Sequence, residues 1–543
     1  MASTWIWRGS YDRLELITFE AGQLNWSGER NGQPIAAKPW TAVKAGDAVL
    51  AWSDVRPIDG SRFPGAWVLN VNGSQAARMP EEEKRRIWQR AGLCGGKPLE
   101  SERLFLVSIV HLEPVEMVRI DRSGRTMDGK PVVKLMEQDT WRSVKTGGMR
   151  EEDALQQRSA AAAGPLLRVN ELPWREAAAV ESERAETGKD GIMRVTGLDD
   201  GAVPAVGHWP EDPAMRRAAR TAVQALYALG LDIGEAEVAL GGDGRTAVRA
   251  AWPKLRDARL EAAALKRFAA WHAAAGAGYA GRRPLLIGAD PEFVLVTPAG
   301  RIAPASRFFG AGAGGSAGAD AVLVRRRLLY PVAELRPEPA EDPAALAANL
   351  RRLLLRAADK VGAPALRWAA GAMPVPGLAL GGHIHISGAP LTGRLLRLLD
   401  SFAAFPLALV EDPAGRARRP RYGTLGDFRL QPHGGFEYRT LPSWLISPAA
   451  AKAAFALTLL CAREAMNLTY IPALEERYVE AYYAGDRDTL AGCLDGVAAA
   501  VSSAAGYAGL APYIEPLLEA ARRGKCWDER SDIRLKWRIP MQK

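Results

Sequence analysis

Between residues 288 and 439, four short stretches carry charged or histidine side chains at every second position of otherwise apolar sequence. They are Asp290-Pro291-Glu292, Glu334-Leu335-Arg336-Pro337-Glu338, His383-Ile384-His385 and Glu437-Tyr438-Arg439. On a β-strand, residues i and i+2 point to the same face of the sheet, so we expect the four stretches to line one cavity. Carboxylates and imidazoles suit divalent cations, and interleaved arginines suit phosphate. The pattern therefore predicts metal-assisted handling of a nucleotide.

The length and composition are those of a multidomain globular protein. The 543 residues, 48% of them hydrophobic and 24% charged, suggest roughly three or four domains. No stretch approaches the roughly 18 apolar residues of a membrane span, and the N-terminus lacks the order of a signal peptide. We therefore expect a cytoplasmic protein without membrane contacts. The cysteines form no C-x-x-C pair, which argues against a zinc ribbon or a disulfide framework; they are Cys94, Cys461, Cys493 and Cys526.

The formal charge of +9 has two interpretations. The excess is arginine in short clusters, such as Arg325-Arg326-Arg327 and residues 416–421. No RNA-binding module or zinc-finger pattern accompanies these clusters, so we do not expect a nucleic-acid partner. A solvated basic surface and a site for a nucleotide or another anionic substrate both stay open. The second cluster lies between the histidine pair and the last polar stretch, which favours the site.

The chain divides into segments that differ in composition and in the pattern of their apolar residues. Residues 1–150 show short alternating runs and predict a mainly β domain of unknown role, with one helix from about Pro80 to Arg90. Residues 151–212 are rich in Ala, Glu and Gly and predict a linker. Residues 213–283 predict a small α/β segment, residues 284–483 a catalytic domain, and residues 484–543 a C-terminal helical segment. The expected fold class is α+β multidomain.

The small α/β segment contains a predicted hairpin. Two strand-like runs flank Gly241-Gly242-Asp243-Gly244, a sequence suited to a tight turn. The piece is similar to the C-terminal end of ATP-grasp domains, where such a hairpin carries a metal-binding Glu-x-Asn. Here the second strand reads Val248-Arg249-Ala250-Ala251 and has neither ligand. The resemblance implies a structural remnant of that fold, and a chance match is the alternative.

The histidine pair is the sharpest signal of a site. Three of the six histidines fall between residues 383 and 433, and Gly381-Gly382 precedes the pair. Burying Asp290 and Glu292 in an apolar strand would cost several kcal/mol unless a metal ion or another partner compensates. Three alternatives stay open: histidines satisfied within the core, an edge strand marked by Pro291, and internal ion pairs within the Glu334 and Glu437 stretches.

A glycine-rich run between residues 310 and 315 formally matches G-x-G-x-x-G. It lacks the preceding strand and following helix of a dinucleotide-binding fold, so it predicts a mobile loop over the site. The chain has no intact P-loop. Any ATP is therefore expected to bind through metal ions and arginines, with Arg421, Arg429 and Arg439 as the candidates.

The motifs resemble those of the amidoligases, phage-type carboxylate-amine ligases of the glutamine synthetase superfamily. The resemblance spans about residues 284–483 and implies a glutamine synthetase-like catalytic domain, an antiparallel sheet with flanking helices. The matching motifs read Gly288-Ala289-Asp290-Pro291-Glu292-Phe293, Ala333-Glu334-Leu335-Arg336-Pro337, Gly381-Gly382-His383-Ile384-His385-Ile386-Ser387 and Phe436-Glu437-Tyr438-Arg439-Thr440.

The resemblance assigns roles to individual residues and implies ATP and magnesium, or manganese, as cofactors. It implies metal ligation by Asp290, Glu292, Glu334, His383 and Glu437. It implies ATP contacts by Arg336, His385, Arg421, Arg429 and Arg439. Catalytic roles would fall to Glu292, Glu437 and Arg439, and Glu338 is a further candidate. This chain has Asp at position 290, where the family pattern has Glu.

The implied reaction is ATP-dependent amide or peptide bond formation. A substrate carboxylate would attack the γ-phosphorus to give an acyl phosphate, and an amine would then displace phosphate. The expected partners are small molecules or peptides that bear a carboxylate and an amine, and a homo-oligomer is an open alternative. Three other functions stay open: a metal-dependent hydrolase with His433 as a further ligand, a non-catalytic nucleotide-binding protein, and a nucleic-acid binder.

Overall fold

The computed structural model describes most of the chain outside the predicted linker. The described residues are 3–9, 13–20, 23–26, 38–53, 55–93, 99, 101–121, 209–210, 212–279, 284–311, 315–324, 327–431 and 435–541. Cys94, Arg325, Arg326, His433 and nearly all of the linker lie outside these residues. Among the helices that the structure describes, none is long and apolar enough to span a membrane.

The first sheet contains six strands from the N-terminal part of the chain, in the order β3-β2-β1-β5-β6, with β4 paired to β2. Their bounds are β1 Thr4–Trp7, β2 Arg13–Glu20, β3 Gln23–Trp26, β4 Lys38–Pro39, β5 Ala48–Ala51 and β6 Trp67–Leu69. β1, β5 and β6 are parallel neighbours, whereas β2 runs antiparallel to β1. Parallel neighbours place their carboxyl ends at the same edge of the sheet.

The second sheet joins two segments that are far apart in sequence. Its order is β10-β9-β7-β8, with all pairs antiparallel. The strands are β7 Arg103–Val110, β8 Glu113–Ile120, β9 Ile233–Leu240 and β10 Thr246–Trp252. The predicted hairpin is confirmed as β9–β10. Because β9 pairs with β7, this hairpin completes a sheet begun before the predicted linker.

The third sheet has eight strands and follows the order β13-β14-β11-β16-β18-β17, with β12 and β15 also paired to β11. Its pairs are all antiparallel. The strands are β11 Leu286–Val296, β12 Ile302–Ala303, β13 Ala317–Val324, β14 Arg327–Leu335, β15 Arg367–Ala369, β16 Gly382–Ser387, β17 Phe428–Leu430 and β18 Phe436–Tyr438. β11 lies between β14 and β16, so the interpretation of Pro291 as the mark of an edge strand is wrong.

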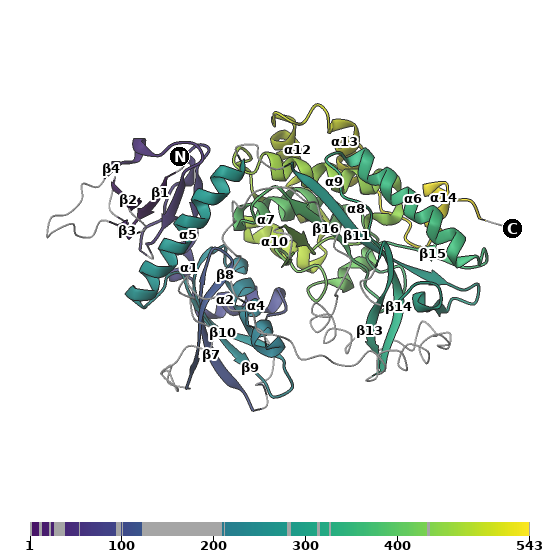
Figure 1. The fold of residues 1–543 in the computed structure, drawn as a ribbon, viewed down its shortest axis with the longest axis horizontal. Helices are drawn as coiled ribbons and strands as arrows, with labels where there is room; N and C mark the ends of the chain where they lie inside the picture. The colour runs from purple at the N-terminus through teal and green to yellow at the C-terminus, as the bar shows by residue number, and fades with distance from the viewer. Residues whose placement is uncertain are drawn as a thin grey trace.

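The described helices cover the sheets, and the structure as a whole is mixed α+β (Figure 1). Those of the N-terminal part are α1 Gly73–Arg78, α2 Glu81–Arg90, α4 Pro213–Ala228 and α5 Ala258–Tyr279. Those that accompany the third sheet are α6 Pro343–Val361, α7 Gly393–Leu399, α8 Phe405–Val410, α9 Pro448–Arg463, α10 Glu476–Ala484, α11 Arg487–Ala491, α12 Leu494–Ser502, α13 Ala511–Arg522 and α14 Ile533–Trp537.

Local sequence explains where these helices begin and end. Asp342 accepts hydrogen bonds from the first turn of α6, Pro343 follows it, and Gly362 ends the helix in the left-handed region. A π-helical turn, Asp400–Ala404, separates α7 from α8, and Pro406 falls in the first turn of α8, where its missing N–H is tolerated.

The third sheet has one apolar face and one face that combines apolar and polar groups. Odd-numbered residues of β11, such as Ile287 and Phe293, join a core with α6 and α9. Even-numbered residues of β16 and β18, such as Ile384 and Tyr438, join the same core. The intervening positions point the other way because side chains alternate across a strand. Register then brings the predicted polar stretches together on this second face.

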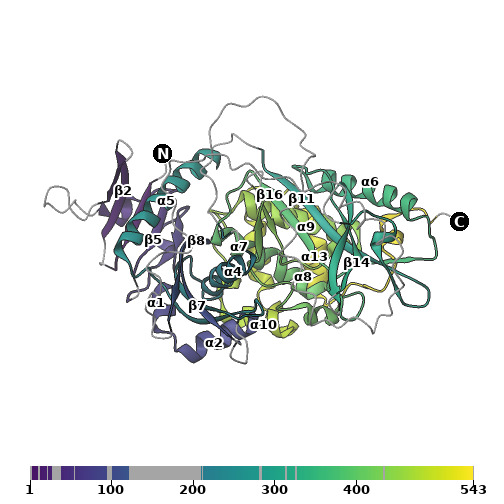
Figure 2. The same cartoon turned by 60° about the horizontal axis from the view of Figure 1, so that its bottom comes forward.

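The N-terminal part packs directly against the third sheet through α4 (Figure 2). The Tyr227 hydroxyl donates to Asp400 Oδ2 at 2.7 Å, and the Tyr438 hydroxyl donates to Asp400 Oδ1 at 2.6 Å. Arg397 Nη1 donates to Asp232 Oδ1 at 2.6 Å from the other side of the contact. These buried polar contacts join α4 to the π-helical turn at Asp400, which Tyr438 of β18 also contacts.

Candidate active site

A cluster of two acids and two imidazoles forms where β11, β16 and β18 lie side by side. His383 Nδ1 lies 3.4 Å from Asp290 Oδ1 and 3.1 Å from Glu437 Oε1, and His385 Nε2 lies 3.1 Å from Asp290 Oδ2. Asp290 is the register partner of His383, and Glu437 is the register partner of His385. The His383–Glu437 and His385–Asp290 contacts are therefore diagonal between these neighbouring pairs. The cluster therefore contains residues that the sequence placed on three separate strands.

The buried atoms of this cluster have the character of metal ligands. Asp290 Oδ1, His383 Nδ1, His385 Nε2 and Glu437 Oε1 are inaccessible to solvent, and none has a hydrogen bond of acceptable geometry. Ligand atoms of Asp290, His385 and Glu437 all lie within 4.8 Å of one another. Buried polar atoms without hydrogen bonds are costly, and a divalent cation coordinated by oxygen and nitrogen would satisfy them. The donor set thus fits a metal ion.

A second acidic cluster lies next to the first, across the β11–β14 pair. Glu292 and Glu334 are register partners, and Asp320 on β13 brings a third carboxylate to within 4.8 Å of both. Gly381 N donates to Glu292 Oε2 at 2.6 Å, which orients that carboxylate. Three carboxylates with oxygen-only donors suit a hard cation such as magnesium or manganese.

Charge pairing sets the ionisation of the first cluster. Burial alone would raise the pKa of Asp290, but its close contacts with His383 and His385 hold that pKa well below its usual range. Burial and Asp290 likewise act to raise the pKa of Glu437, and His383 and Arg439 overcome them to lower it to about 2. Burial acts to lower the pKa of His383, but Asp290 and Glu437 raise it well above its usual value. In the metal-free protein these groups therefore form a charged, mutually dependent set.

In the second cluster, the pKa of Glu334 is shifted upward. Burial, and then the charges of Asp290 and Asp320, raise the pKa of Glu334 well above its usual value, although Arg336 acts to lower it. Three neighbouring carboxylates repel one another when all are ionised. A bound cation would remove this repulsion and let Glu334 ionise, which is a second indication that the cluster suits a metal.

Two arginines and a glutamine also contact the Glu437 carboxylate. Arg429 Nε donates to Glu437 Oε2 at 2.7 Å, and Gln431 Nε2 donates to the same oxygen at 2.9 Å. Arg439 Nε lies 3.2 Å from Glu437 Oε1. The Glu437 side chain is fully buried, whereas that of Arg429 is 35% exposed. Arg429 therefore lies between the buried cluster and solvent, where a phosphate group could reach it.

The remaining predicted residues lie at different distances from the two clusters. Arg336 is paired with Glu334 and also donates to the carbonyl oxygen of Gly315 at 3.3 Å, so it borders the second cluster. The guanidinium of Arg421 lies over the ring of Tyr422, 5.5 Å from its centroid. Glu338 follows the end of β14 and is exposed. Residues 312–314 of the predicted mobile loop lie outside the described residues.

The structure adds three residues that the sequence pattern did not indicate. Asp320 has Gly318 and Val322 at the i−2 and i+2 positions, so no alternating polar pair marks it. Gln431 follows Arg429 by two residues, and this signal depends on recognising the short strand β17. Arg220 lies on α4, far from the motifs in sequence, and only the packing of α4 brings it close.

Arg220 is half-buried, and its charge interacts with the charges of Arg429 and Arg439. Burial is the main cause of its lowered pKa. Asp427 acts to raise this pKa, while Arg439 and Arg429 lower it further. The N-terminal part of the chain therefore contributes positive charge beside the predicted phosphate-binding arginines.

A family comparison shows what the segment that carries this arrangement is similar to. Residues 287–539 match the family model described as phage phiEco32-like COOH.NH2 ligase-type 2. The match supports a carboxylate-amine ligase of the amidoligase type. The match contains every residue of the two clusters and extends through the C-terminal helices to the end of α14. The resemblance inferred from the four motifs is confirmed.

Two other comparisons add little. No curated protein matches the chain. Among solved structures, the crystal structure of a bifunctional glutathione synthetase from Pasteurella multocida matches with 11% identity and a TM-score of 0.31. The match covers 47% of this chain and 52% of that one, so the chain spans about half the length of the structure that it resembles.

Proposed function

We propose that the protein is an ATP-dependent carboxylate-amine ligase that forms an amide or peptide bond through an acyl phosphate. The observation that carries the proposal is the pair of adjacent clusters, Asp290, His385 and Glu437 beside Glu292, Asp320 and Glu334, with arginines at their rim. We further propose a glutamine synthetase-like arrangement, in which the reaction takes place over one face of the antiparallel sheet.

The two clusters would each hold one divalent cation, magnesium or manganese. Asp290, His385 and Glu437 would bind the first, with His383 oriented against the same acids. Glu292, Glu334 and Asp320 would bind the second. Bound cations of this kind neutralise phosphate oxygens and align the phosphoryl group for in-line transfer.

The chain's own cations would stabilise the charge that develops on the transferring group. Arg429 and Arg439 are held by Glu437, so their guanidinium groups are preorganised and need little rearrangement when a phosphate approaches. The five N–H donors of a guanidinium allow Arg429 to keep its bond to Glu437 while donating to a phosphate oxygen. Arg336 would act similarly at the second cluster.

The proposed reaction has two balanced steps. A carboxylate oxygen of the first substrate attacks the γ-phosphorus of ATP, the bond to the β–γ bridging oxygen breaks, and ADP leaves. An uncharged amine of the second substrate then attacks the acyl carbon, and inorganic phosphate leaves with the electron pair of the carbon–oxygen bond. The amine also loses a proton, which a buried carboxylate of the site could accept.

The test is substrate-stimulated release of ADP and phosphate. The full chain is incubated with ATP, magnesium and pools of amino acids, peptides and polyamines, beside a Glu292→Gln, Glu437→Gln double variant. Glu82→Gln is the matched control, because it makes the same chemical change on an exposed residue of α2, outside both clusters. We expect stimulation in the wild type and the control and none in the double variant. If no pool stimulates ADP release in the wild type, the ligase proposal is wrong.

A further inference from the structure

Three segments of the chain converge on one buried carboxylate, that of Asp400. Its side chain lies in the π-helical turn between α7 and α8 and is fully buried. The Tyr227 hydroxyl of α4 donates to its Oδ2 at 2.7 Å, and the Tyr438 hydroxyl of β18 donates to its Oδ1 at 2.6 Å. The backbone N of Gly426, in the loop before β17, donates to the same Oδ1 at 3.1 Å. Asp400 therefore connects a helix of the N-terminal part with a strand and a loop of the candidate active site.

Each of these three segments carries one arginine beside the first cluster. Arg439 is the residue after the hydrogen-bonded tyrosine of β18, and Arg429 follows the loop glycine by three residues. Arg220 precedes the α4 tyrosine by seven residues within one helix. Seven residues are close to two helical turns, so both side chains lie on the same face of α4. The contacts of Asp400 therefore bear on the positions of all three arginines.

The loop is also joined to the end of β18 by contacts on either side of Gly426. Arg439 N donates to the carbonyl oxygen of Asp427 at 3.0 Å. Thr440 Oγ1 donates to the carbonyl oxygen of Thr424 at 2.8 Å. A shift of the loop would therefore be passed to the backbone of Arg439.

Tyr227 is placed by packing as well as by its hydrogen bond. Gly426 has a φ of +68°, and a Cβ added there would overlap the ring of Tyr227, so helix and loop are in close contact. The guanidinium of Arg397 lies over the same ring, 5.0 Å from its centroid. These contacts leave the Tyr227 hydroxyl little freedom to move away from Asp400.

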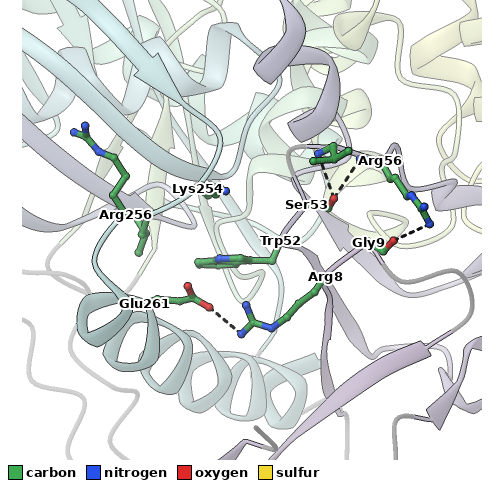
Figure 3. A pocket seen from close by; sticks show the side chains of 10 residues that line it. Arg8, Gly9, Trp52, Ser53, Arg56, Lys254, Arg256 and Glu261 are labelled. Atoms are coloured by element: carbon green, nitrogen blue, oxygen red, sulfur yellow. Dashed lines mark hydrogen bonds and ion pairs between the residues drawn. The ribbon is translucent and has the colours of Figure 1, made fainter.

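The contact of α4 with Asp400 belongs to a wider interface. Asn70, just after β6, exchanges hydrogen bonds with Asp232, whose Oδ1 accepts from Arg397 Nη1 at 2.6 Å. Within the N-terminal part, Arg8 at the end of β1 donates to Glu261 of α5 at 2.9 Å, at the edge of a cavity (Figure 3). Polar contacts therefore join the first sheet both to α5 and to α7, the helix that precedes Asp400.

We propose that Asp400 is a positioning residue, which holds Arg220, Arg429 and Arg439 in the arrangement that receives the phosphates of ATP. Arginines of like charge repel one another, so their approach needs support from other contacts. Hydrogen bonds to an ionised acceptor are stronger than those between neutral groups, and one buried carboxylate fixes its donors relative to one another. The inference rests on the proposed function, because these arginines are its proposed phosphate-binding groups.

The experiment is calorimetric titration of the full chain with a non-hydrolysable ATP analogue and magnesium, beside kinetics of ADP release. It is done at pH 8, where Asp400 is ionised although burial raises its pKa to about 6. Tyr227→Phe removes one hydroxyl and keeps the ring, and Asp400→Asn keeps the shape of the side chain. We expect each variant to weaken analogue binding by about fivefold or more, within the roughly 5- to 150-fold range usual for coupling between sites.

The kinetics should show the same pattern. The KM for ATP should rise with a smaller effect on kcat, and the number of bound manganese ions should not change, because no proposed metal ligand is altered. Tyr507→Phe is the matched control and should change neither value. Its hydroxyl also donates to a carboxylate, Glu515 Oε1 at 2.9 Å, but outside both clusters. If Asp400→Asn fails to fold, Tyr227→Phe alone decides, since it removes a single oxygen atom.

A double-mutant cycle separates positioning from a general loss of stability. If Tyr227 acts by placing Arg220, the effect of Tyr227→Phe on analogue binding should shrink in an Arg220→Gln background. An equal fold-change in both backgrounds would overturn the proposal. Unchanged binding in both Tyr227→Phe and Asp400→Asn, with a wild type that binds, would overturn it too and leave the proposed function standing. A wild type that does not bind the analogue would refute the proposed function itself, and this inference with it.

Discussion

His385 reaches Asp290 although its own register partner on β11 is Gly288. A Cβ added to Gly288 would lie 3.4 Å from the Cβ of His385, so the two backbones are close at this pair. The 3.1 Å contact between His385 Nε2 and Asp290 Oδ2 is diagonal across the strand pair. Both histidines of the motif therefore converge on one carboxylate.

Replacement of Asp290 by Asn should abolish most activity without unfolding the protein. The carboxylate holds both imidazoles and is a proposed metal ligand. We expect turnover to fall by more than about 100-fold, because even losing partners outside the ligand shell typically costs roughly 10- to 100-fold in metal affinity or activity. Manganese binding, followed by electron paramagnetic resonance, should weaken in parallel. Binding of manganese with wild-type affinity and stoichiometry would contradict the assignment of Asp290 as a ligand.

Asp320 provides a sharper test of the second cluster, because the sequence pattern did not indicate it. Asp320→Asn removes one of three proposed ligands, so we expect the number of tightly bound manganese ions to fall by one and turnover to drop at least about tenfold. Asp488→Asn, on the exposed side of α11, is the control and should change neither. If Asp320→Asn retains full activity and full metal stoichiometry, the second cluster contains only the two glutamates.

The sequence predicted those parts of the site that depend on alternation within one strand. Each of the stretches around Asp290, His383 and Glu437 shows a polar i, i+2 pattern, and strand geometry alone puts such pairs on one face. Contacts between strands depend on register and sheet order, which local sequence does not encode. For this reason the sequence could not show that Asp320 completes the second cluster. It also could not show which arginine lies nearest to Glu437.

Contacts between distant parts of the chain could not be predicted from local sequence either. The β7–β9 pairing joins segments on either side of the predicted linker, and no turn signal marks it. The docking of α4 rests on Tyr227 and Asp400, which are separated by 173 residues in sequence. Helix boundaries were easier because capping residues such as Asp342 and Gly362 act within one turn. The limits of the N-terminal domains stay predictions.

Gly381 should be sensitive to substitution for a steric reason. A Cβ at this position would lie 2.5 Å from His383 Nε2, and the buried imidazole has little room to move. Gly381→Ala should therefore displace His383 from Asp290 and Glu437 and reduce turnover by about tenfold or more, since misplacing a catalytic group by 1 Å can cost about 100-fold. Gly509→Ala is the control, because nothing lies within 4 Å of its added Cβ. Equal turnover in both variants would contradict this account.

The buried carboxyl group of Glu529 should make stability depend on pH. Burial is the main cause that raises its pKa to about 7, although backbone N–H groups of Met373 and Asp412 donate to it. The folded state thus holds a proton that the unfolded state has already released, so stability decreases as pH rises from about 4.5 to about 7. The loss from this group is at most roughly 3 kcal/mol. Denaturant unfolding measures this effect in the wild type and in Glu529→Gln as a function of pH. The difference between their free energies of unfolding should shrink as the pH rises over this range and should stay constant above it.

The contribution of α4 to the site is tested through Arg220. This residue lies beside Arg429 and Arg439 in an environment short of negative charge, and burial and these neighbours lower its pKa. A polyphosphate would relieve the repulsion among the three arginines. Arg220→Gln should therefore raise the KM for ATP by about tenfold with a smaller effect on kcat, since the lost interaction is present before and during phosphoryl transfer. Arg220→Lys should restore part of the affinity by retaining the charge. An unchanged KM in Arg220→Gln would show that α4 supports the site only by packing.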